Sequence, residues 1–159
     1  MIFEQGVYGL DVDVERTRAY YAQAGGVDCG CSGCRNYAVA VKQMPRTVRG
    51  FLEQFGIDPA KPAETTAYNA LADGQTWYHA WFHICGQIQE GTEPFRQTGP
   101  KSFELKREYQ IPLGGDSDVW FMADCDLLDK AFPRPAYQLE VTFYLPWVLE
   151  EPNDYLYEE

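Results

Sequence analysis

The spacing of apolar residues changes partway along the chain, from a helical period to a strand period. Apolar side chains first recur every three or four positions, which is typical of amphipathic helices. Asp13 is placed to cap the first helix, Gly25 and Gly26 follow its end, and Pro45 separates the second helix from the third. A short alternating stretch at 8–12 predicts a strand before them. The predicted helices cover residues 14–24, 32–44 and 45–55.

Beyond the proline-containing connector at 58–62, apolar and polar residues alternate, which predicts strands. Asp73-Gly74 and Gly114-Gly115 each stand between two such runs and are typical of two-residue hairpin turns. In the last run, every odd position from Tyr137 to Trp147 is apolar, so one face of that strand should be buried. The predicted strands cover residues 64–72, 75–90, 102–113, 116–127 and 137–149.

Together these patterns predict a single α+β domain over residues 1–159. Two or three N-terminal helices should pack on an antiparallel sheet of about five or six strands, and a sandwich or open barrel is the competing architecture. The chain divides into a helical part (about 14–63), a β-rich part (about 64–149) and an acidic tail (150–159).

Composition and charge narrow the function classes. The net charge of -11 argues against a nucleic-acid partner or an anionic membrane surface, since both attract clusters of Lys and Arg. The first residues lack the basic and apolar regions of a secretory signal, so we expect a cytoplasmic protein. Thiols stay reduced there, and clustered cysteines then favour metal binding or redox chemistry over disulfides.

The cysteine spacing C-x-C-x-x-C at the start of the second predicted helix is the strongest chemical signal. Three thiolates supply most of a tetrahedral zinc site, and such a site needs one more ligand. Alternation along the strand at 75–90 places further ligand types on one face of that strand. We therefore predict a structural zinc site formed by Cys29, Cys31, Cys34 and one of His83, Cys85 or His79.

Four other residues have supporting roles in this prediction. If Asp73-Gly74 is a two-residue turn, Tyr68 lies opposite His79 and Glu64 lies opposite His83, so each could orient an imidazole. Arg35 and Asn36 follow the last cysteine of the motif and are expected to orient the site or nearby backbone.

Three alternatives stay open. Cys31 and Cys34 could form a redox pair at a helix N-terminus, although thioredoxin-like sites follow a strand, and a helix precedes these cysteines. The thiols could instead be buried core residues. In that case the sheet could bind a small molecule or protein partner through its aromatic strand or its acidic hairpin. No motif predicts an enzyme activity, and the hairpin aspartates favour a solvated surface: Asp116, Asp118, Asp124, Asp126 and Asp129.

The N-terminal half resembles a family of small bacterial proteins without an assigned activity. The resemblance rests on the motif Asp-Cys-x-Cys-x-x-Cys-Arg-Asn-aromatic at 28–37 and on the stretch 51–64. It implies a bacterial cytoplasmic setting and groups Cys29, Cys31, Cys34, Arg35 and Asn36 as one unit.

Overall fold

The computed structural model describes residues 1–155 and has the predicted α+β architecture. The helices are α1 (Val14–Gln23), α2 (Ser32–Ala40) and α3 (Arg46–Glu53), with 3-10 turns η1 (Val41–Gln43) and η2 (Arg107–Tyr109). The strands are β1 (Ile2–Gln5), β2 (Tyr8–Val12), β3 (Glu64–Ala70), β4 (Gln75–Glu90), β5 (Phe95–Gly99), β6 (Ser102–Leu105), β7 (Ile111–Pro112), β8 (Asp118–Met122) and β9 (Ala136–Pro146). No helix within the described part is long and apolar enough to span a membrane.

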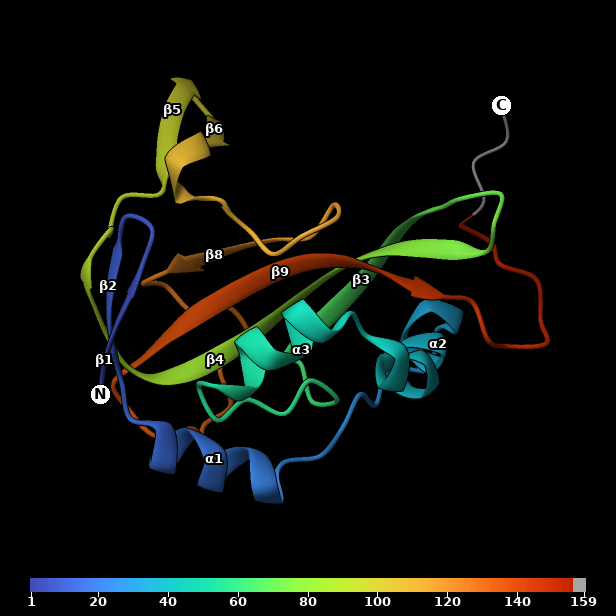
Figure 1. Ribbon diagram of the computed structural model, residues 1–159, viewed down its shortest axis with the longest axis horizontal. Helices are drawn as coiled ribbons and strands as arrows, with labels where there is room; N and C mark the ends of the chain where they lie inside the picture. The colour runs from blue at the N-terminus through green and yellow to red at the C-terminus, as the bar shows by residue number, and fades with distance from the viewer. Residues whose placement is uncertain (156–159) are drawn as a thin grey trace.

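Seven strands form one antiparallel sheet, somewhat larger than the five or six expected. Its order is β1-β2-β4-β9-β8-β7, with β3 paired to β4, while β5 and β6 form a separate hairpin. Figure 1 shows that hairpin projecting from the sheet. β1 and β5 were not predicted, because β5 is almost wholly exposed and β1 is only 4 residues long, with Phe3 as its one hydrophobic side chain packed against the core.

The three predicted helices are present. The Asp13 carboxylate accepts the Arg16 backbone N–H at 3.0 Å, so α1 begins where the N-cap signal stands. The second helix ends earlier than expected, because the α-helix tightens into η1 after Ala40. Gly56 follows α3 with φ of 87°, a conformation that favours glycine.

The turn between β3 and β4 differs from the prediction. Four residues, 71–74, connect the strands, and the Leu71 N–H donates to the Gln75 carbonyl at 2.7 Å. An irregularity between Ala67 and Ala70 shifts the register further. Thr66, not Tyr68, therefore lies opposite His79, and Glu64 lies opposite Trp81 instead of His83.

The second predicted hairpin is also shorter than expected. The run 102–113 divides into β6, η2 and β7, and β6 pairs with β5. Of these three pieces, only β7 pairs with β8, across the loop that contains Gly114 and Gly115. Local alternation did not distinguish one long strand from two short ones with different partners.

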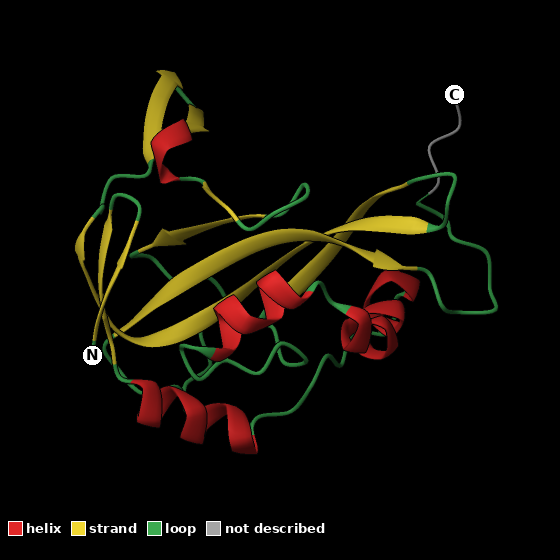
Figure 2. Cartoon of the chain, in the orientation of Figure 1, coloured by secondary structure: helices red, strands yellow, loops and turns green. Residues whose placement is uncertain are grey.

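The hydrophobic core lies between the helices and one face of the sheet. The odd residues of β9 from Tyr137 to Leu145 are buried there, as the apolar alternation predicts. The even residues of β4 face the same side, where the Tyr78 ring lies 5.6 Å from that of Tyr37 on α2. Helices, not a second sheet, cover this face (Figure 2). The other face carries the odd residues of β4 from Gln75 to Trp81, which are all partly exposed.

Candidate metal centre

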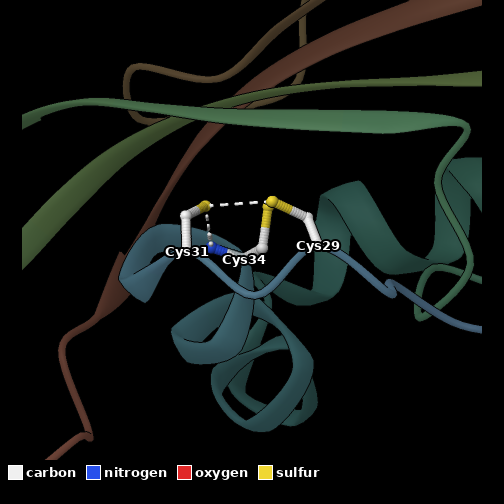
Figure 3. Close-up of side chains that lie close together, drawn as sticks. All are labelled: Cys29, Cys31 and Cys34. Carbon is white, nitrogen blue, oxygen red and sulfur yellow. Dashed lines mark hydrogen bonds between the residues drawn. The ribbon is translucent and has the colours of Figure 1, made fainter.

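The thiol cluster forms where an extended loop enters α2. Cys31 is the N-cap of this helix, and its sulfur accepts the backbone N–H of Cys34 at 3.4 Å. The preceding loop turns Cys29 back, so that its Sγ lies 3.3 Å from the Sγ of Cys31. Figure 3 shows the three side chains converging on the side of α2 that faces β3.

The three sulfur atoms all lie within 4.8 Å of one another. Zinc–thiolate bonds of about 2.3 Å place the ligands of a tetrahedral site about 3.8 Å apart, so the cluster needs little adjustment to bind such an ion. No fourth His, Cys, Asp or Glu of residues 1–155 joins the group. Cys29 and Cys31 are exposed and Cys34 is buried, so the cluster is open to solvent on one side.

The surroundings shift two thiols in opposite directions. The Cys34 backbone N–H lowers the pKa of the Cys31 thiol, because it stabilises the thiolate at the helix N-terminus. Burial raises the pKa of the Cys34 thiol well above its ordinary value, and the hydrogen bonds that this thiol donates to Cys31 and Cys29 add to the rise. Cys31 is therefore more ready than Cys34 to bind a metal or attack a disulfide, because Cys34 must first lose a proton.

Close packing against the sheet explains the glycine inside the motif. A Cβ at Gly33 would lie 2.9 Å from the Tyr155 hydroxyl and 3.1 Å from the Cβ of Ala67 on β3. The Tyr78 hydroxyl also donates to the Gly33 carbonyl at 2.8 Å. The first turn of α2 can approach the sheet this closely because residue 33 has no side chain.

Arg35 holds the cysteine loop to the chain that follows β9. Its Nε donates to the Gly30 carbonyl at 3.0 Å, and its two terminal nitrogens pair with both carboxylate oxygens of Glu151. This pairing holds the pKa of the Glu151 carboxyl below its usual range. Glu151 belongs to the predicted acidic tail, of which residues 156–159 lie outside the described part. Sequence reasoning missed its role, because nothing local distinguishes it from Glu150.

Asn36 is fully buried and joins α2 to the end of β9. Its amide nitrogen donates to the Tyr78 hydroxyl and to the Pro146 carbonyl, both at 3.1 Å. Its amide oxygen accepts the Val148 N–H at 2.8 Å. The side chains of Arg35 and Asn36 thus hold the backbone of the cysteine loop and of the chain after β9, and they form no hydrogen bond with the thiols.

The candidate ligands on β4 do not join the thiol cluster. His79 Nε2 lies 2.8 Å from Glu140 Oε1, and His83 Nε2 lies 2.9 Å from Gln138 Oε1. Burial lowers the pKa of His83, which favours its neutral form. Cys85 is a buried core residue, and burial raises the pKa of its thiol.

The two expected partners of these histidines are placed differently. Tyr68 is not opposite His79 in the ladder, but its ring stacks on the imidazole with centroids 6.3 Å apart. Glu64 accepts the N–H of Thr65 at 3.0 Å with its own side chain. Thus Tyr68 contacts a histidine diagonally, and Glu64 interacts with its neighbour in the chain.

The aromatic face of β4 is not packed under the helices. Trp77 and Trp81 are partly exposed on the opposite side of the sheet, where Trp77 contacts Tyr144 and the Trp81 indole donates to the Asp126 carbonyl at 3.3 Å. The acidic residues nearby form no three-residue ligand group within residues 1–155. Asp129 instead accepts the Tyr20 hydroxyl at 2.8 Å.

Comparison with known proteins gave no match to a protein-family model, to a curated protein or to a solved structure. The fold and the site therefore define the class: an α+β protein with a three-cysteine cluster that could bind a metal.

Proposed function

We propose that this protein binds a zinc ion through Cys29, Cys31 and Cys34. The observation that carries the proposal is the convergence of three sulfurs within 4.8 Å at a helix N-terminus. Soft thiolates select zinc, copper(I) or iron–sulfur clusters, and iron–sulfur clusters are usually held by four cysteines. Zinc suits three thiolates with a fourth position left to a non-protein ligand.

Bound zinc would close the loop at 24–31 onto the first turn of α2. The loop has no regular secondary structure, and Arg35 already fixes its carbonyl at Gly30. Binding must release a proton from Cys34, since the metal takes the thiolate form. The ion would thus stabilise the α2 end of the molecule, with no ligand taken from β4.

Elemental analysis of protein purified without chelator tests the proposal. We expect about one zinc per chain, with thiols that react slowly until a chelator is added. Cys125→Ser is the matched control, because Cys125 is partly buried, like the cluster as a whole, but lies outside it. Substoichiometric metal together with freely titrating thiols would rule out zinc binding.

A second candidate function uses Cys31 and Cys34 as a redox pair. Cys31 is exposed with a lowered pKa, and Cys34 is buried behind it. The Cys31 thiolate would attack a substrate disulfide and expel one thiolate, and the Cys34 thiol, on losing its proton to solvent, would then displace the second. The two cysteines end oxidised and the substrate reduced. Cys34→Ser should trap the mixed disulfide; failure to trap one with a small disulfide such as oxidised glutathione would exclude this function.

A further inference from the structure

The β5–β6 hairpin projects from the body of the protein as a separate two-stranded sheet (Figure 1). Every residue of its two strands is exposed except Gly99 and Leu105, which are partly buried. The strand register places Phe95 and Phe103 on the same face of the hairpin, where they are 40% and 66% exposed. An isolated two-stranded hairpin is marginally stable in water, so this apolar face is suited to being covered by a partner.

The hairpin also differs in charge from the rest of the protein. Residues 95–109, which span β5, β6 and η2, carry four basic and two acidic side chains. The rest of the chain carries nine basic and 22 acidic side chains, so a basic, aromatic arm projects from a strongly acidic body. Two such hairpins would repel each other, whereas an acidic surface would attract either one.

The sheet face opposite the helices, here called the outer face, has the complementary character. Its strands β3, β4, β8 and β9 contain no lysine or arginine. In the strand register, Glu140 of β9 lies between Trp81 of β4 and Trp120 of β8. Glu64 lies on the other side of Trp81, and Asp118 is two positions from Trp120 on the same face. Both tryptophans and both flanking carboxylates are partly exposed, so this face suits a basic, aromatic partner.

We propose that two copies of this chain form a dimer in which each copy lays its β5–β6 hairpin on the outer face of the other. The occupant is a second copy because one chain carries both complementary surfaces, and its hairpin, exposed on both sides, does not cover its own outer face. Exchange of two arms across a two-fold axis uses both surfaces and leaves no open end from which a filament could grow. No residue of the thiol cluster belongs to either surface, so the dimer does not depend on zinc.

Sedimentation velocity at protein concentrations from about 1 μM to about 1 mM, a range that covers weak and moderate affinities, tests the dimer. At about 0.1 M salt we expect a concentration-dependent dimer. Raising the salt to about 1 M should weaken it about tenfold, because the Debye length falls from about 10 Å to about 3 Å. A monomer throughout this range would overturn the proposal, and a dimer that does not respond to salt would contradict the complementarity of charge.

Two variants locate the contact. Phe103→Ser on the hairpin and Trp120→Ser on the outer face should each raise the dimer dissociation constant about a hundredfold. A two-fold dimer loses the altered contact twice, at about tenfold each time. Val39→Ser is the control and should leave the constant unchanged, because Val39 is 54% exposed on α2 and belongs to neither surface.

Mixing the two variants distinguishes exchanged arms from paired hairpins. The mixed dimer keeps one intact contact, between the hairpin of the Trp120→Ser chain and the outer face of the Phe103→Ser chain. Both changes fall in its other contact, where the second costs little once the first is made, so the mixture should associate about tenfold more tightly than either variant alone. Such rescue would also show that both variants fold. Loss of the dimer in Phe103→Ser alone, or no rescue in the mixture, would overturn the assignment to the outer face.

Discussion

The thiol loop and strand β4 both hold several metal-ligating side chains, but only the loop brings them together. Cys29, Cys31 and Cys34 converge within 4.8 Å. On β4, His79 and His83 each interact with a separate partner on β9, Glu140 and Gln138. A strand advances about 3.3 Å per residue, so side chains four positions apart are separated by about 13 Å. Alternation places residues on one face but does not bring them to one point.

A second difference is the side of the sheet. The even residues of β4 face the helices, and Tyr78 contacts both Gly33 and Asn36 of α2. The odd residues, which include His79 and Trp81, project from the opposite face. The sheet itself therefore separates the histidines from the thiols.

Replacing one cysteine in each region by serine should give the largest difference in zinc affinity. Cys34→Ser should lower zinc affinity at least about a hundredfold, because a hydroxyl is a poor ligand for this ion. Cys85→Ser should leave it within about twofold. Competition with a chromophoric chelator measures both. Equal losses in the two variants would show that β4 does contribute a ligand.

Asn36→Ala should break the attachment of α2 to the sheet. It removes three hydrogen bonds at a fully buried position and leaves polar partners unpaired, so we expect about 3 kcal/mol lower free energy of unfolding. The control is Asn153→Ala, which removes two bonds at a partly exposed position and should cost about 1 kcal/mol. Chemical denaturation monitored by circular dichroism gives both values. A loss no larger than that of the control would contradict this role for Asn36.

The pH dependence of zinc affinity distinguishes the two regions. Burial keeps Cys34 protonated at neutral pH, because its pKa is raised, and zinc must displace that proton. Affinity should therefore rise with pH, about tenfold per unit for each proton released, through the neutral and mildly alkaline range. A site built on the His83 imidazole without the thiols would level off above about pH 6.5, since burial lowers the pKa of that imidazole. Titration with a chelator at several pH values measures the slope.

The smallest effect is expected at Arg35. Arg35→Lys keeps the positive charge but loses the paired contact to Glu151 and the bond to Gly30, so the cysteine loop should be held less firmly. We expect zinc affinity to fall about twofold, because both side chains are largely solvated. Arg18→Lys, in an exposed pair with Glu15, is the matched control and should leave affinity unchanged. An unchanged affinity in Arg35→Lys would mean that zinc alone orders the loop.

The sequence by itself determined the features that depend on near neighbours. The N-cap at Asp13, the proline boundary before α3 and the buried odd face of β9 all follow from local sterics and periodicity. The thiol cluster belongs here too, because Cys29, Cys31 and Cys34 are held by one loop and one helical turn.

Only the tertiary structure decided what lies around that cluster. The four-residue turn at 71–74 and the irregularity after Ala67 set the register of β3, so that Glu64 lies opposite Trp81 and Tyr68 contacts His79 only diagonally. Tertiary packing also decided that Glu151 would reach Arg35 and that the buried Thr65 hydroxyl would lack a hydrogen-bond partner. Such contacts join residues far apart in the chain, and side-chain periodicity specifies a face of a strand but not its neighbour across the sheet.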